Sequence, residues 1–262
     1  MNLLSEWAEW KADLPPYFLA SDAPLLLSER SARATITRAS WPEAYTADDY
    51  CAPGDTRLHL GLIPQPFFGD LRRATVFLLL LNPGLGPDDY FGEYKVPGFR
   101  DALLRNLKQE FPAESQRFIF LDPQFSWHGG FDWWHSKLAR VIEQLARDWR
   151  VSYSAARAEM AKSLASIELF PYHSSSFHDT GGWLLHLRSV QLAREYVRDI
   201  LIPRVCRMEA IVIVTRQARA WDLPPGGGVV VYTAGEARAA HLTPDSPGGR
   251  AIIAHLISRG GT

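Results

Sequence analysis

The chain has 262 residues, of which 47% are hydrophobic and 22% are charged, and its formal net charge at pH 7 is −1. These values are ordinary for a globular enzyme. A net charge near zero gives no evidence for a polyanionic partner, so a nucleic-acid surface would have to be a local patch. Cys51 and Cys206 are the two cysteines, which are too few for a disulfide framework, a four-cysteine zinc site or an iron–sulfur cluster.

The N-terminal residues have no pattern of a targeting signal. Residues 1–14 contain Glu6, Glu9 and Asp13 among apolar residues, with neither a basic leader nor a long apolar core. No later segment reaches membrane length. We therefore expect a cytoplasmic protein with no membrane partner, folded as one large domain or as one domain with an extension.

The first part of the chain leads up to a strongly apolar segment. Residues 1 to about 70 show the least regular pattern, with a short helical beginning followed by proline-rich stretches. Residues 58–73 are expected to form a loop that packs Phe67 and Phe68 against a sheet. Residues 76–81 are all apolar, which is typical of a central strand buried on both faces.

Apolar periodicity predicts alternating helices and strands in the remainder. Helices are expected at residues 98–110, 136–149, 154–164, 183–205 and 250–258, and further strands at 166–170, 210–215 and 228–233. The buried stripe of the helix at 183–205 is expected to contain Leu187, Val190, Val197, Ile200, Leu201 and Val205. This order predicts an α/β fold: a three-layer α/β/α sandwich with a central, mainly parallel four-stranded sheet.

Polar residues follow two of the predicted strands at the point where each strand ends. The turn Asn82-Pro83-Gly84 ends the first strand, because proline restricts φ and glycine relieves the Cβ clash. The second strand also ends at a proline, Pro171, which is followed by Tyr172, His173, Ser174, Ser175 and Ser176. Ligands of open α/β sheets bind beyond the carboxyl ends of the strands, so we expect the second exit to lie near the first.

The order of these motifs resembles the uracil-DNA glycosylase superfamily. A strand ends in Asn82-Pro83-Gly84, another in Pro171-Tyr172-His173, and the fourth is followed by His241-Leu242-Thr243-Pro244. The Asn-Pro-Gly motif is similar to that of the mismatch-specific and thymine-DNA glycosylase branch. The resemblance covers residues 58–258 and implies a catalytic domain at 58–262 after an N-terminal extension at 1–57. It also implies duplex DNA as the partner, a base flipped out of the stack, an abasic product and no cofactor or metal.

Asn82 suits one specific step of base excision. Cleavage of a nucleoside N-glycosidic bond passes through an oxocarbenium-like sugar, so water has to be delivered to one face while the departing base is stabilised. Asn82 can orient that water by hydrogen bonding, but its carboxamide cannot act as a general base. Asp89, beside Asp88, is a candidate to assist catalysis, although acidic residues in this position are also typical of a helix cap.

Two histidines are candidates to stabilise the departing base. The resemblance places His241 where the superfamily has a histidine that contacts a base carbonyl, a task that suits an imidazole donor. The match is incomplete, because Leu242 replaces a proline and Asp245 stands where a leucine wedge often occurs. His173, in the polar exit of the second strand, is the competing candidate.

Gly84 indicates the class of base. In the uracil-specific branch the matching position holds a tyrosine that blocks carbon-5 substituents, so the resemblance implies space for a larger base beside Pro83, Gly84 and Leu85. In the aromatic segment 125–134, most rings are expected to be buried, while Phe125 or Trp127 could stack on an extruded base. Some members of the superfamily excise hypermodified bases, including glucosylated cytosines, from phage DNA, and these features are compatible with that activity.

Several residues are candidates to bind DNA phosphates. Hydroxyl groups, and backbone N–H groups with a cation at a helix start, are common phosphate ligands. The candidates of this kind are Ser174, Ser175, Thr243, Gly249 and Arg250. A modest excess of arginine over acidic residues after position 200 supports DNA binding weakly.

Three other functions fit the same residues. The chain could be a repair glycosylase for uracil or mismatched thymine, a nucleoside or nucleotide hydrolase on a similar sheet, or a catalytically silent nucleic-acid-binding module. The resemblance makes a DNA glycosylase that acts on an enlarged pyrimidine the leading hypothesis.

Overall fold

The apolar segment 76–81 supplies the middle strand of the main sheet. The computed structural model describes residues 2–29, 31–113, 116–178, 182–216, 218–223, 226–237 and 242–260. Over these residues the main sheet has five strands, in the order β3-β5-β4-β6-β7. Their bounds are β3 (Phe67–Phe68), β4 (Val76–Leu80), β5 (Leu164–Glu168), β6 (Ile211–Val214) and β7 (Val229–Val231). The expected α/β class is confirmed, but the expectation of four strands is wrong, because Phe67 and Phe68 pair as a fifth.

The strand register keeps apolar residues next to each other. The β4–β6 pair is parallel with Val76 opposite Ile211, and the β6–β7 pair is parallel with Val212 opposite Val229. The side chains of β4 from Val76 to Leu79 are fully buried, as the uninterrupted apolar sequence predicts for a strand covered on both faces.

The chain divides into two units. The first unit contains Met1–Phe67, Leu81–Glu110 and Glu168–Val197, and the second contains Phe68–Leu80, Phe111–Ile167 and Arg198–Thr262. The expected boundary between residues 57 and 58 lies inside the first unit.

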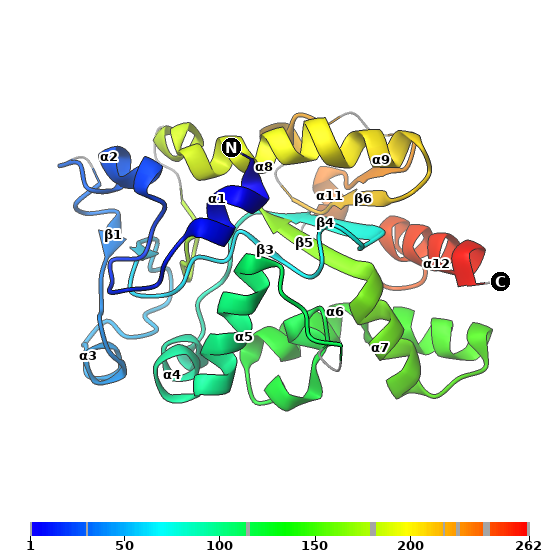
Figure 1. Ribbon diagram of the computed structural model, residues 1–262, viewed down its shortest axis with the longest axis horizontal. Helices are drawn as coiled ribbons and strands as arrows, with labels where there is room; N and C mark the ends of the chain where they lie inside the picture. Colours follow the sequence, from blue (N-terminus) through cyan, green and yellow to red (C-terminus); the bar gives the residue numbers. More distant parts are fainter. Residues whose placement is uncertain are drawn as a thin grey trace. The chain divides into compact units, whose positions relative to one another are not determined.

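The second unit contains most of the sheet and the helices around it. Figure 1 shows β4, β5 and β6 together, with α6 and α7 drawn below them and α9 above. The last helix packs against β6, β7 and α6. The helical segments of this unit are Ile119–Leu121, Pro123–Phe125, α6 (Gly129–Trp149), α7 (Tyr153–Ser163), α9 (Ile202–Cys206), α10 (Ala218–Trp221), α11 (Ala234–Ala237) and α12 (Pro247–Gly260).

The first unit combines the N-terminal residues with the segments that follow β4 and β5. Its two-residue strands β1 (Thr35–Ile36) and β2 (Leu58–His59) pair in parallel. Its helical segments are α1 (Leu3–Glu9), Ala20–Asp22, α2 (Ala23–Leu26), α3 (Trp41–Tyr45), α4 (Pro87–Lys95), α5 (Pro97–Lys108), Trp183–His186 and α8 (Arg188–Tyr196).

A buried carboxylate ties the N-terminal residues into the first unit. Asp22 is fully buried, and its two oxygens accept hydrogen bonds from the Tyr172 hydroxyl at 2.6 Å and from the Ser189 N–H at 3.1 Å. The same hydroxyl accepts from the Leu19 N–H at 3.3 Å. Residues before position 57 therefore take part in the core of this unit.

Two helices differ from their predicted extents. Helix α6 begins at Gly129 instead of 136, because His128 caps it by accepting the Gly130 N–H at 2.9 Å, and histidine is not a residue that sequence patterns identify as a cap. The predicted helix at 183–205 is interrupted by a π-helical turn at Val197–Leu201. The wider turn changes the direction of the side chains within it, so Ile200 is 48% exposed and its predicted burial is wrong.

No helix within the described ranges combines the length and the apolar character needed to cross a membrane.

The start of α12 depends on the absence of a side chain at Gly249. A Cβ placed there would lie 1.8 Å from the Thr243 carbonyl oxygen, which is backbone and cannot move aside, whereas a Cβ at Gly98 would meet nothing within 4 Å. We expect Gly249→Ala to lower the free energy of unfolding by about 1–3 kcal/mol. Gly98→Ala, the matched control in α5, should leave it unchanged or raise it by less than about 1 kcal/mol. Urea unfolding measures both, and equal stability of the two variants would contradict the packing described.

Candidate active site at the exits of β4 and β5

Four hydrogen bonds join the segment after β4 to the segment after β5. Phe170 N–H donates to the Leu81 carbonyl at 2.9 Å, and Ser174 N–H donates to the Pro83 carbonyl at 3.3 Å. The Asn82 side chain reaches the Ser174 Oγ at 3.0 Å, and the His173 Nδ1 lies 2.8 Å from the Gly84 carbonyl oxygen. The expectation that the two exits lie beside each other is confirmed.

The carboxamide of Asn82 has a defined orientation. Its Nδ2 donates to the Pro83 carbonyl at 2.8 Å and to Ser174 Oγ at 3.0 Å, which uses both amide hydrogens. A carbonyl oxygen can only accept, so the atom facing it has to be the nitrogen, and this decides the assignment of the amide. Across the described ranges, the Asn82 Oδ1 has no hydrogen-bond partner. That oxygen is therefore the atom with which Asn82 can accept a hydrogen bond from water.

The position next to Asn82 and Pro83 is open. Gly84 is exposed, and a Cβ placed on it would have no atom within 4 Å. The neighbouring Leu85 is half-buried and packs against the apolar cluster that contains Leu62 and Tyr90. The turn is therefore anchored on one side by Leu85 and leaves free space on the side of Gly84.

His173 is a buried and neutral part of this arrangement. It is 1% exposed, and burial lowers the pKa of its imidazole from 6.5 to about 4, although the carbonyl groups of Gly84 and Ile63 oppose that shift. Because the Gly84 carbonyl only accepts, Nδ1 carries the hydrogen of the neutral ring. His173 therefore holds the backbone at Gly84 in place.

A second buried histidine supports His173 from β2. The backbone N–H of His59 donates to the His173 carbonyl at 2.9 Å. In the His59 ring, Nδ1 lies 3.1 Å from the Tyr90 hydroxyl and Nε2 lies 3.3 Å from Asp55 Oδ2. Burial lowers the pKa of His59 to about 4 as well, against the opposing effect of Asp55. No motif in the sequence marks His59, since only the tertiary fold brings residue 59 next to residue 173.

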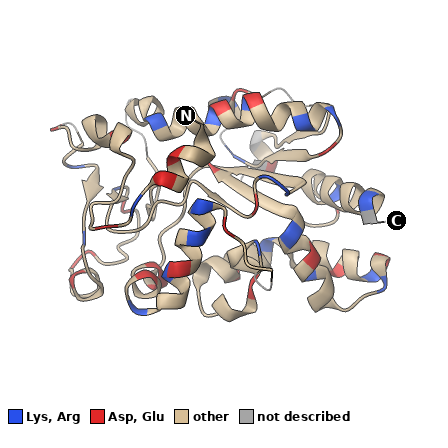
Figure 2. Cartoon of the chain, viewed as in Figure 1, with Lys and Arg blue, Asp and Glu red and all other residues tan. Residues whose placement is uncertain are grey.

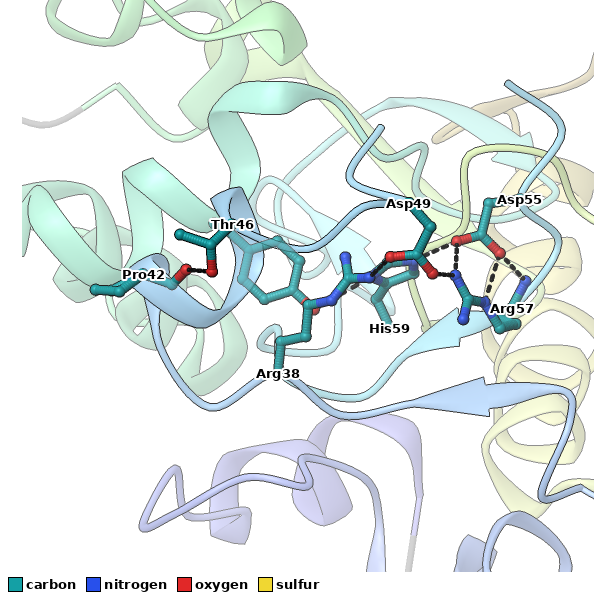
Figure 3. A network of polar contacts seen from close by, with 8 residues as sticks. Arg38, Pro42, Thr46, Asp49, Asp55, Arg57 and His59 are labelled. Carbon is teal, nitrogen blue, oxygen red and sulfur yellow. Dashed lines mark hydrogen bonds and ion pairs between the residues drawn. The ribbon is translucent and has the colours of Figure 1, made fainter. Parts of the chain in front are cut away.

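The neutral ring of His59 contacts Asp55, which belongs to a chain of charged groups. Figure 3 shows Asp55 between His59 and Arg57, and Asp49 between Arg57 and Arg38. The Arg57 guanidinium donates to both oxygens of Asp55, at 2.9 and 2.7 Å, and holds the pKa of this carboxyl well below its usual range. The Asp55 carbonyl also accepts the Ser176 N–H at 2.9 Å, so the network supports the exit of β5 through its backbone.

Asp89 and Tyr172, two expected site residues, make hydrogen bonds that stabilise the fold. The Asp89 Oδ2 accepts the Gly86 N–H at 2.6 Å at the start of α4, which is the geometry of a helix cap. Tyr172 is 1% exposed, and its hydroxyl is bound to Asp22 and Leu19. These contacts favour the capping interpretation of Asp89 and a packing role for Tyr172.

The two serines proposed to bind phosphate differ from each other. Ser174 is 2% exposed, with its hydroxyl at Asn82 and its N–H at Pro83, whereas Ser175 is exposed. Ser174 is therefore placed to serve Asn82, while Ser175 remains accessible to a phosphate.

The other expected site residues belong to the second unit. Phe125, Phe131 and Trp134 are buried while Trp127 and Trp133 are exposed, so the prediction that most rings of the aromatic segment are buried is confirmed. Of the two candidates to stack on a base, Trp127 is accessible at 40% exposure, whereas Phe125, at 4%, is not. His241, the candidate base-contacting histidine, lies outside the described residues.

The start of α12 has few unused backbone donors. The Gly248 N–H donates to the Tyr232 hydroxyl at 3.2 Å, the Gly249 N–H to Ser246 Oγ at 3.0 Å and the Arg250 N–H to the Ser246 carbonyl at 2.9 Å. The Ser246 hydroxyl in turn donates to the Thr243 carbonyl. A phosphate at this helix would therefore be bound by side chains, such as that of the exposed Arg250, whose guanidinium also donates to the Asp245 carbonyl.

Comparison of the chain with protein-family models, with curated proteins and with solved structures finds no match. A search of the described ranges also finds no group of three or more His, Cys, Asp or Glu side chains that could hold a metal ion.

The buried histidines predict loss of stability in mild acid. The unfolded chain takes up protons on His59 and His173 near pH 6.5, whereas the folded chain does so only near pH 4, so unfolding becomes easier as the pH falls through this window. Each histidine contributes up to about 3 kcal/mol, fully present above pH 6.5. We expect His173→Asn, which retains a donor for the Gly84 carbonyl, to flatten the dependence of unfolding free energy on pH between 6.5 and 4.

The exposed His186 is the matched control, and His186→Asn should leave the pH dependence unchanged. Urea titrations at several pH values measure the effect. An unaltered slope in His173→Asn would show that His173 titrates normally in the folded chain.

Proposed function

We propose that the chain is a monofunctional DNA glycosylase that removes an enlarged pyrimidine from DNA. The observation that carries this proposal is the orientation of Asn82, whose two amide hydrogens are held by Pro83 and Ser174 while Oδ1 is left to accept from water. This geometry suits water placement at the end of a central strand, where α/β proteins bind ligands. The parallel β4–β6–β7 pairs support the uracil-DNA-glycosylase-like arrangement that the motifs imply.

The proposed reaction breaks the bond between C1′ of the sugar and the nitrogen of a flipped base. The oxygen of the water bound at Asn82 forms the new bond to C1′, the base departs with the bonding electrons, and the water proton passes to solvent. Asn82 orients the water without taking its proton. A departing anion is stabilised by hydrogen-bond donors, a role we assign to His241, because the single hydrogen of neutral His173 is already donated to the Gly84 carbonyl.

Gly84 supports a large substrate base. Its exposure and the free space around a Cβ at this position match the expectation that no side chain limits the base here. A glucosylated 5-hydroxymethylcytosine is the substrate we favour, which would make the protein an antiviral enzyme acting on phage DNA in the cytoplasm. In Figure 2 the positions of acidic and basic residues are interspersed along the ribbon. Helix α12 contains Arg250 and Arg259 and no acidic residue, which supports a local DNA contact there.

The deciding experiment offers the purified protein separate DNA duplexes. They contain uracil, mismatched thymine, 5-hydroxymethylcytosine or its glucosylated form, and alkali then reveals abasic sites on a gel. We expect cleavage of the glucosylated duplex and a loss of at least about 100-fold in rate for Asn82→Ala, because water placement is an orientation effect. Binding of the substrate duplex by Asn82→Ala should be retained.

Cleavage of uracil or mismatched thymine in place of the glucosylated base would identify a repair enzyme. Intact duplexes with release of base from free nucleosides would identify a nucleoside hydrolase. Binding of DNA without any base release would contradict the enzymatic proposal and leave a binding module.

The open space at Gly84 makes a separate prediction about specificity. Gly84→Tyr should lower the rate on the glucosylated base by at least about 100-fold, because the ring would fill the space needed by the carbon-5 substituent. Gly84→Ala adds a methyl group that meets no atom within 4 Å and is the matched control, which should stay within about threefold of the wild-type rate. Unchanged activity of Gly84→Tyr on the bulky base would show that Gly84 does not face the substrate.

A further inference from the structure

We propose that Ser174 is a positioning residue that fixes the Asn82 carboxamide so that Oδ1 points at the attacking water. This inference rests on the proposed glycosylase function and assigns Ser174 to the reaction centre instead of to DNA phosphate. The Ser174 Oγ accepts one amide hydrogen of Asn82 at 3.0 Å, and the Pro83 carbonyl accepts the other at 2.8 Å.

The two hydrogen bonds from Asn82 Nδ2 fix the orientation of the carboxamide, whereas one hydrogen bond would not. The terminal torsion of an asparagine side chain has a broad preference, so a carboxamide held by a single hydrogen bond can still swing about that bond. The Pro83 carbonyl decides which end of the amide faces the protein, because it can only accept. The Ser174 hydroxyl adds a second point on the same nitrogen, and the two together define the plane of the amide and the direction of Oδ1.

Ser174 is itself held in place, which a positioning residue requires. Its side chain is 2% exposed, and its N–H donates to the Pro83 carbonyl at 3.3 Å. The residue before it, His173, is bound through its ring to Gly84 and through its carbonyl to the His59 N–H. Two residues later, the Ser176 N–H donates to the Asp55 carbonyl at 2.9 Å. The backbone is thus anchored on both sides of the hydroxyl.

The contribution should be to rate and not to affinity. An angular error in a water-positioning group affects the approach of water to C1′, whereas the flipped base and the phosphates are bound by other residues. We expect Ser174→Ala to lower the single-turnover rate of base release by about 10–100-fold. The dissociation constant for a duplex with a non-cleavable 2′-fluoro analogue of the substrate should change by less than about threefold.

The matched control is Ser31→Ala in the same unit. Ser31 is fully buried, and its Oγ lies 2.7 Å from the carbonyl oxygens of both Leu26 and Ser28, which share its one hydrogen, so this variant also loses a buried hydrogen bond. It should be destabilised without a change in the single-turnover rate. A rate loss in both variants would indicate a general structural effect and would overturn the proposal.

A double-variant cycle tests whether Ser174 acts through Asn82. If it does, Asn82→Ala combined with Ser174→Ala should be no slower than Asn82→Ala alone, because the group being positioned is already absent. If Ser174→Ala lowers the residual rate of Asn82→Ala by the same factor as in the wild type, Ser174 acts independently and the proposal is overturned. A wild-type rate for Ser174→Ala overturns it too, while inactivity of Asn82→Ala would still support the glycosylase function.

Crystal structures of the wild-type protein and of Ser174→Ala separate this inference from the proposed function. We expect the carboxamide of Asn82 to be rotated or disordered in the variant, even if no DNA substrate is cleaved. An unchanged, well-ordered carboxamide would overturn the positioning role whatever the outcome of the activity assays.

Discussion

The hydrogen bonds between the exits of β4 and β5 are the constraint on which the site depends. Asn82, Pro83 and Gly84 would form an isolated turn without them, and the Asn82 carboxamide would be free to rotate. Ser174 and His173 remove that freedom by binding one side chain and two backbone carbonyls of the turn. Because Pro83, His173 and Ser174 are buried and Asn82 is half-buried, water competes weakly for most of these bonds, and the arrangement is preorganised before any substrate arrives.

Residues of the N-terminal segment stabilise the hydrogen-bonded exits of β4 and β5. Asp55 and His59 hold the backbone at residues 173 and 176, and the ion pairs with Arg57, Asp49 and Arg38 fix Asp55 in turn. Neutral buried histidines are useful in this position, because a neutral imidazole can hold a carbonyl without bringing a charge into the core. The two neutral histidines also make the unit sensitive to acid, since protonation of either ring would place a charge where burial disfavours it.

Patterns that extend over many residues were predictable, and features set by one or two residues were not. The alternation of apolar strands and helices identified β4, β5, β6, β7 and the helices α5, α6, α7, α8 and α12, but not the nine-residue helix α4. The polar residues after β4 and β5 predicted the place of the site. The two-residue strand β3 was missed because two residues show no periodicity. The exposure of Ile200 was missed because a π-turn changes the helical phase without a sequence signal, and the early start of α6 was missed because histidine is an unusual cap.

The sequence by itself determined that Asn82-Pro83-Gly84 ends a buried strand, because six apolar residues followed by proline and glycine leave the chain no way to continue in the sheet. It also determined that a position without a side chain stands two residues after the amide. Only the tertiary structure decided which atoms the amide meets. Hydrogen bonds between residues 82 and 174, or between 59 and 173, depend on the packing of segments far apart in the chain, and no local pattern encodes them. Packing therefore gave Ser174 a place beside Asn82, whereas the helix cap at Asp89 is a local contact with Gly86 that the sequence already suggested.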